Sequence, residues 1–88
     1  MKYNIIYRSE KIILKDISKI NKADLANILD KFDKIKELWL LSSQVKKLNN
    51  YKICDYRFRV WNYRVLFDID ENKREIIVFR ILHRSKLY

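Results

Sequence analysis

The spacing of apolar residues changes once along the chain, from helical to strand-like. Residues 2–8 alternate as a short strand would, with Tyr3, Ile5 and Tyr7 on one face. The next thirty residues follow helical spacing instead. From Tyr56 onward, apolar and polar positions alternate again with a period of two, which predicts strands.

Two helices are expected between these strand regions. In residues 9–20 the isoleucines recur at helical spacing, and Asn21 with Asp24 then forms a cap-box-like start for a second helix. A single apolar stripe follows along that second helix: Leu25, Ile28, Leu29, Phe32, Ile35 and Trp39. A stripe of this kind is far more typical of a helix face packed on a sheet than of a ligand site.

Three antiparallel strands are expected in the second half, one in residues 56–61, one in 63–70 and one in 75–82. Their apolar positions define the predicted core face: Tyr56, Phe58, Val60, Val65, Phe67, Ile69, Ile77, Phe79 and Ile81. The chain has no glycine and no proline, so asparagines such as Asn62 and Asn72 are expected to make the turns.

The predicted fold is therefore α+β with two layers. An N-terminal strand and a two-helix hairpin precede a three-stranded antiparallel meander, and residues 1–88 form a single domain. With one cysteine and one histidine, a structural metal site or a cofactor is not expected. No apolar run is long enough to cross a bilayer or to act as a secretory signal, which favours a cytoplasmic protein with no membrane partner.

The net charge of +9 favours a polyanionic partner. Eleven of the thirteen lysines lie at or before Lys52, whereas six of the seven arginines come after it. Because the planar guanidinium matches phosphate oxygens in a bidentate manner, the arginine-rich half suggests a phosphate site. The alternative is a basic surface that is merely solvated.

Arg57, Arg59 and Arg64 are expected to converge on the sheet face opposite the core. Crowded like charges repel, so the cluster is a candidate phosphate-binding site, to which Lys47 would add another cation. Pairing of the arginines with Asp55, Asp68 or Asp70 is the structural alternative. Trp61 is expected beside them, either to stack on an RNA base or to cover the core.

Candidates for proton transfer follow the last predicted strand. RNA can be cut without a metal when a base activates its own 2′-hydroxyl, cations stabilise the phosphorane and an acid protonates the departing 5′-oxygen. His83 is the best proton carrier in the chain because histidine titrates near neutral pH. Arg84 and Tyr88 are the other candidates, although an unperturbed phenol titrates only near pH 10.

The second half of the chain resembles the RelE/ParE toxins, particularly their RelE-type branch. The resemblance rests on 48–50 (LNN), 56–60 (YRFRV), 63–68 (YRVLFD), His83-Arg84 and Tyr88. The family pattern usually has glycine before the Tyr63-Arg64 pair and near His83, where this chain has Asn62 and Leu82. The order of the predicted elements agrees with the RelE-like microbial ribonuclease fold.

The resemblance implies the toxin of a type II toxin–antitoxin pair, an endoribonuclease that cuts translated mRNA in the ribosomal A site. It implies that Arg57 and Arg59 hold phosphate, that Arg64 stabilises the transition state, and that Arg84 and Tyr88 complete the site. The role of His83 as general acid is a hypothesis from its position. The expected partner is an acidic, RelB-like antitoxin, in a heterodimer or heterotetramer. Two alternatives stay open: a ParE-like inhibitor of DNA gyrase, and an RNA- or ribosome-binding module without chemistry.

Overall fold

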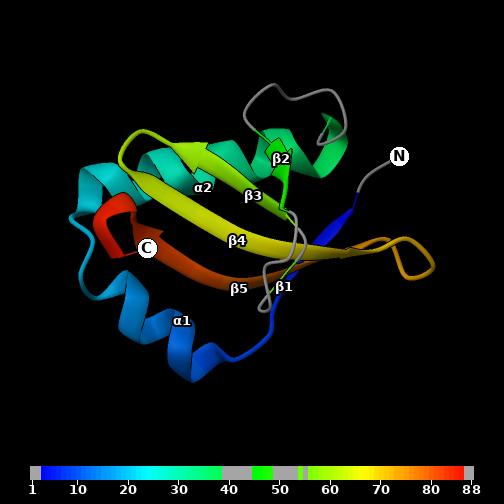
Figure 1. Ribbon diagram of the computed structural model, residues 1–88, viewed down its shortest axis with the longest axis horizontal. Coiled ribbons are helices and arrows are strands. Elements are labelled where there is room, and N and C mark those ends of the chain that lie inside the picture. The colour runs from blue at the N-terminus through cyan, green and yellow to red at the C-terminus, as the bar shows by residue number, and fades with distance from the viewer. Residues whose placement is uncertain (1–2, 39–44, 49–53, 55, 87–88) are drawn as a thin grey trace.

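The computed structural model describes residues 3–38, 45–48, 54 and 56–86. The elements run in the order β1 (Asn4–Tyr7), α1 (Glu10–Ile17), α2 (Lys22–Leu38), β2 (Val45–Lys47), β3 (Tyr56–Val60), β4 (Tyr63–Asp70), β5 (Glu75–His83) and a 3₁₀ turn (Arg84–Lys86). Figure 1 shows α2 behind the sheet and α1 below β5. The predicted α+β class and the order of strand, two helices and meander are confirmed.

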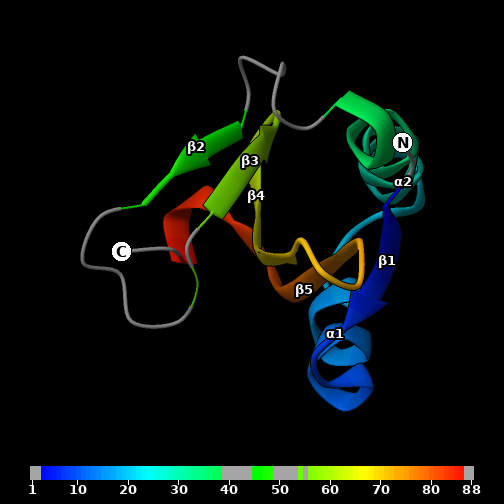
Figure 2. The same ribbon diagram turned by 90° about the vertical axis from the view of Figure 1, so that its right-hand side faces the viewer.

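The strands form one mixed five-stranded sheet in the order β1-β5-β4-β3-β2. The pairs β2–β3, β3–β4 and β4–β5 are antiparallel, whereas β1 runs parallel to β5. The sheet is strongly curved, with β1 and β2 at its two edges (Figure 2). The short edge strand β2 was not predicted, because three residues with two adjacent lysines carry no readable alternation.

Both helices begin with the caps that their sequences favour. Ser9 caps α1, its hydroxyl accepting from the amide of Ile12. At the start of α2 the amide of Asp24 donates to Asn21 Oδ1 at 2.8 Å, and Asn21 Nδ2 donates back to the Asp24 carboxylate at 3.0 Å. The predicted capping box is therefore confirmed.

One apolar cluster joins both helices to one face of the sheet. Its buried members are Tyr3, Ile13, Ile28, Phe32, Phe58, Val60, Val65, Phe67, Ile76, Val78 and Ile81. The Phe58 ring packs edge-on against both Phe32 and Phe67, with centroids 5.6 and 5.7 Å apart. Leu29, predicted in the packed stripe of α2, is 46% exposed instead. Trp39 lies outside the described residues.

The prediction for the core face of β5 was wrong in its first half. The register between β4 and β5 shifts between Leu66 and Phe67, so that Leu66 pairs with Arg80 and Phe67 with Val78. Phe79 is the extra residue of this bulge, and it reverses the alternation. Ile76 and Val78 therefore face the core in place of Ile77 and Phe79, and Ile81 faces it as predicted.

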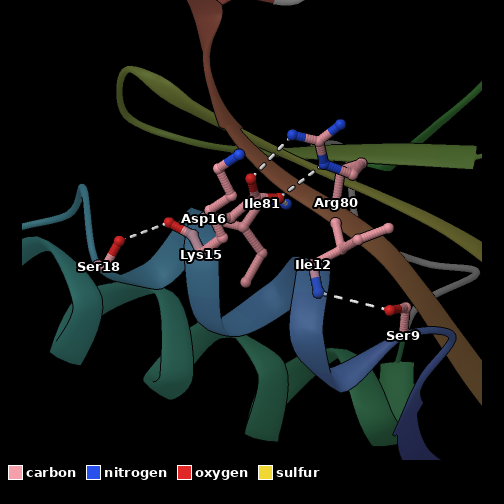
Figure 3. A network of polar contacts seen from close by, with 7 residues as sticks. All are labelled: Ser9, Ile12, Lys15, Asp16, Ser18, Arg80 and Ile81. Carbon is pink, nitrogen blue, oxygen red and sulfur yellow. Dashed lines mark hydrogen bonds and ion pairs between the residues drawn. The ribbon is translucent and has the colours of Figure 1, made fainter.

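A carboxylate fastens α1 to the free edge of β5. Strand β1 pairs with β5 only as far as Val78, where the amide of Arg8 still reaches the Val78 carbonyl. Beyond that point Asp16, which is buried, accepts from the Ile81 amide at 3.1 Å and from two nitrogens of Arg80 at 2.8 Å each (Figure 3). The side chain thus replaces the missing strand partner at this edge.

The Asp16 carboxyl is held in its ionised form. Burial alone would raise its pKa, but the hydrogen bonds from Arg80 and Ile81 and the charges of Arg80 and Lys19 outweigh that effect and lower the pKa. A lowered pKa means that the contact stabilises the fold fully above the pKa of an unfolded aspartate, about 4. The stabilisation is lost as the pH falls through the folded pKa.

Replacing Asp16 with Asn should lower the free energy of unfolding by about 2–4 kcal/mol at neutral pH, because Arg80 loses its buried ionic partner. The difference from the wild type should shrink as the pH falls below about 4. Urea unfolding over a pH series measures both. The control is Asp30→Asn, which breaks the exposed pair to Lys34 at 3.4 Å and should cost at most about 0.5 kcal/mol. Equal losses in the two variants would contradict the role given to Asp16.

Candidate nucleic-acid interface

The strand register places four cations on the sheet face opposite the core. Arg59 lies directly opposite Arg64 across β3 and β4, and Lys46 lies directly opposite Arg57 across β2 and β3. Directly opposed residues of antiparallel strands share a face, with Cβ atoms about 5 Å apart. We call Lys46, Arg57, Arg59 and Arg64 the cationic face. The predicted convergence of the three arginines is confirmed.

Lys47 is placed differently from the prediction. It pairs with Tyr56, whose alternation with Phe58 and Val60 puts it on the core side of the sheet. Lys46 takes the position expected for Lys47. Because neighbouring residues of a strand point to opposite faces, only the register with β3 distinguishes the two lysines.

Two pairs of like charges face each other across strands, which raises the positive potential of this face. Arg59 is exposed, whereas Arg57 and Arg64 are half-buried beside Leu66, which is fully buried. Arg80 pairs with Leu66 in the register, but Asp16 holds its guanidinium. Of the aspartates considered as partners, Asp68 alternates with Arg64 and Leu66 along β4 and so lies on the same face as the arginines. Asp70 accepts from the amides of Asn72 and Lys73 in the β4–β5 turn. Asp55 lies outside the described residues.

Arg64 is oriented by the turn between β3 and β4. Its Nη1 donates to the Trp61 carbonyl at 2.9 Å and to the Tyr63 carbonyl at 3.0 Å. Both bonds come from Nη1, one of the two terminal nitrogens of the guanidinium. The guanidinium is therefore held at the hairpin end of the sheet.

Trp61 is in the turn and not in the strand. It is the first residue of a two-residue turn, has a φ of 55° and is 69% exposed. The positive φ falls on Trp61 where the sequence suggested Asn62, and this first position usually favours glycine. The exposure rules out a lid over the core, which leaves the ring available for contact with a partner.

The 3₁₀ turn after β5 is tied to the same hairpin. The Arg84 amide donates to the Asn62 carbonyl at 2.7 Å, and the Arg84 side chain is exposed. This bond brings Arg84 next to the turn that orients Arg64. Tyr88, the remaining candidate, lies outside the described residues.

His83 lies on the other face of the sheet from the arginines. It pairs with Tyr63, and the two rings meet edge-on with centroids 5.5 Å apart. Tyr63 belongs to the core side, where burial and a hydrogen bond with Asp24 raise the pKa of its hydroxyl. A general acid must reach the reacting phosphate, so we leave His83 out of the catalytic set.

A cavity of about 260 Å³ borders His83 on this side. Its lining combines apolar and charged groups: Asp16, Lys19, Ile20, Tyr63, Ile81, Leu82, His83, Ser85 and Lys86. No cluster of three or more histidine, cysteine or acidic side chains suited to a metal occurs within the described part of the chain. Within that part, no helix is long and apolar enough to cross a membrane.

Comparison with known families identifies the chain. The family described as ParE toxin of type II toxin-antitoxin system, parDE, matches residues 10–88. The chain belongs to this toxin family. It is therefore the toxin of a type II toxin–antitoxin system, within the RelE/ParE superfamily that the sequence suggested.

Solved structures of this superfamily share the fold of the toxin. The toxin–antitoxin complex RelBE2 from Mycobacterium tuberculosis superposes with a TM-score of 0.80 at 21% identity, covering 96% of this chain and 100% of that one. The RelE–RelB complex from Pyrococcus horikoshii gives 0.77 at 21% identity, covering 98% and 99%. A mutant of the E. coli toxin RelE in the free state gives 0.74 at 18% identity, covering 99% and 88%. No curated protein sequence matches the chain.

Replacing Arg59 with Thr should raise the free energy of unfolding of the toxin by about 0.5 kcal/mol at low salt, because it removes one of two opposed charges. The gain should shrink as salt screens the repulsion. Urea unfolding at two salt concentrations measures it. Lys73→Thr, in the exposed β4–β5 turn, is the control and should show no such gain. A loss of stability in Arg59→Thr would show that the arginine is kept for folding.

Proposed function

We propose that this toxin is an endoribonuclease that cuts translated mRNA on the ribosome without a metal. The observation that carries the proposal is the cationic face, where Arg59 opposes Arg64 and Lys46 opposes Arg57. Such pairs concentrate positive charge on one face of the sheet, which favours the binding of an anion. The phosphates of single-stranded RNA match the charge of this face.

The cations of this face divide into two roles. Lys46, Arg57 and Arg59 would hold the phosphates on either side of the bond that is cut. Arg64, fixed at the hairpin by the Trp61 and Tyr63 carbonyls, would stabilise the charge that builds on the scissile phosphate. A guanidinium oriented before the substrate arrives needs no reorganisation during the reaction.

The reaction would be an internal transfer. The 2′-oxygen attacks the adjacent phosphorus, the bond to the 5′-oxygen breaks, and a 2′,3′-cyclic phosphate forms. One proton leaves the 2′-hydroxyl and one is delivered to the 5′-oxygen. We assign Arg84 to the developing charge and Tyr88 to proton transfer, as the resemblance implies, and the bond from Arg84 to Asn62 supports a site at this end of the sheet.

Trp61 is suited to hold a base. An exposed indole at the tip of a hairpin, next to cations, is the arrangement in which aromatic residues stack on unpaired bases. Each such stack contributes about 1–3 kcal/mol. The ring would fix the register of the mRNA against Arg59 and Arg64.

The partners would be the ribosomal A site and an acidic antitoxin. The structures similar to this chain include complexes of RelE toxins with RelB antitoxins. A partner of that kind, acidic and partly disordered, would cover the cationic face in a heterodimer or heterotetramer, with charge complementarity speeding association.

Inhibition of DNA gyrase is the second candidate. The family that matches residues 10–88 is named for ParE, whose gyrase-directed members cut no RNA. Under this reading the cationic face would bind acidic protein or DNA. Plain binding to RNA or the ribosome, without cleavage, is a further outcome that the same experiment detects.

Induced expression in a bacterium, with primer extension on a reporter mRNA, separates these functions. Cuts should appear in the translated message and be absent from the same message without its start codon. Arg64→Ala and Tyr88→Phe should each reduce cleavage on the order of 10²-fold, because each removes a group that acts in the transition state. Lys73→Thr should cut as the wild type does.

The variants must be folded for the comparison to hold, and urea unfolding of purified Arg64→Ala checks the hairpin that this residue ties together. Growth arrest without cuts, together with DNA damage dependent on gyrase, would replace the ribonuclease with the gyrase inhibitor. Ribosome binding without cuts or arrest would leave a binding module.

A further inference from the structure

His83 makes a contact that defines the state of its ring. Its Nδ1 accepts a hydrogen bond from the Ser85 amide at 3.2 Å and lies 2.9 Å from the Ser85 hydroxyl. A backbone N–H can only donate, so Nδ1 must carry a lone pair. The contact therefore requires the tautomer that carries its proton on Nε2.

The same contact fixes the turn that carries Arg84. Two consecutive amides are held, that of Arg84 by the Asn62 carbonyl at 2.7 Å and that of Ser85 by the imidazole. The ring itself is held edge-on against Tyr63, whose hydroxyl is bound to Asp24. A chain of contacts thus runs from the first turn of α2 through Tyr63 and His83 to the 3₁₀ turn.

The charged groups near the ring do not supply another anchor for the turn. Asp16, Lys19 and Lys86 share the cavity lining with His83, and Asp24 reaches Tyr63 from α2. Asp16 is already engaged by Arg80 and the Ile81 amide. Lysines cannot accept a hydrogen bond from a backbone amide. Among these neighbours, His83 is the acceptor that orders Ser85.

We infer that His83 is a positioning residue whose neutral imidazole, through Nδ1, orders the 3₁₀ turn and so presents Arg84 to the cationic face. This inference rests on the proposed ribonuclease function for its effect on cleavage, but its structural part stands without it. The ring lies on the core side of the sheet, on the opposite face from the arginines. The role differs from that of a general acid in the ring nitrogen on which it depends.

A general acid must donate a proton to the reacting oxygen. The positioning role requires instead that Nδ1 accept a hydrogen bond from the Ser85 amide. Protonation turns Nδ1 into a donor that faces the Ser85 amide, which breaks the contact.

Two variants of His83 distinguish the role of Nδ1 from that of Nε2. In His83→Asn the amide oxygen can take the place of Nδ1, whereas in His83→Gln the amide group takes the place of Nε2. The His83→Asn variant should keep cleavage of ribosome-bound mRNA within about threefold of the wild type. The His83→Gln variant should reduce cleavage on the order of 10²-fold, because the displaced Arg84 guanidinium no longer contacts the phosphate. Equal, strong losses in both variants would overturn the positioning role.

A second readout does not depend on activity. Nitrogen-15 NMR of the imidazole in the purified toxin should show the proton on Nε2. Hydrogen exchange at the Ser85 amide should be slow in the wild type and in His83→Asn, and at least tenfold faster in His83→Gln. A proton on Nδ1 would refute the inference. So would a rate of hydrogen exchange at the Ser85 amide that is the same in His83→Gln as in the wild type. If the wild type cuts no RNA at all, the proposed function fails while these measurements still decide the role of His83 in the turn.

Discussion

The buried carboxylate of Asp16 joins α1 to the part of β5 that lies beyond the end of β1. Strand β1 is too short to cover the length of β5, and the edge beyond Val78 would otherwise be left without a partner. Asp16 satisfies the Ile81 amide and binds Arg80 with two bonds, which fixes α1 against the strand. His83 and the 3₁₀ turn follow directly after this anchored segment. The contact of Asp16 with β5 therefore helps to position the end of the sheet that carries Arg64 and Arg84.

The face of the sheet opposite the core concentrates positive charge. Here Arg59 faces Arg64 and Lys46 faces Arg57. The repulsion is tolerable because it lies over a well-packed core on the other side, where Phe58, Val65 and Phe67 are fully buried. The stability of one face thus permits the concentration of charge on the other.

Much of the fold could be predicted from the sequence, because its signals are local. The Asn21–Asp24 capping box and the alternation in β3 and β4 each depend on residues a few positions apart. What could not be predicted depends on pairing between strands. The bulge at Phe79, the edge strand β2 and the parallel β1–β5 pair are set by partners far away in the sequence.

The same division applies to the candidate site. Alternation within β3 and β4 predicted that Arg57, Arg59 and Arg64 share a face. It could not distinguish Lys46 from Lys47, because that choice depends on the register of β2. His83 was expected to follow the last strand, whereas it is the last residue of β5 and shares the face of Ile81; its pairing with Tyr63 depends on the register between β4 and β5. The positive φ of Trp61 also had no local signal, since bulky residues rarely occupy that position.

The central claim is that the cationic face binds the phosphates of RNA, and the salt dependence of binding tests it most directly. Affinity of the purified toxin for a short single-stranded RNA would be measured by fluorescence anisotropy over a range of salt concentrations, for the wild type, Arg59→Thr and Lys73→Thr. Each phosphate contact contributes about 0.7 to the slope of log affinity against log salt. The slope should fall by about that amount in Arg59→Thr and stay unchanged in Lys73→Thr. An equal slope for wild type and Arg59→Thr would contradict the claim.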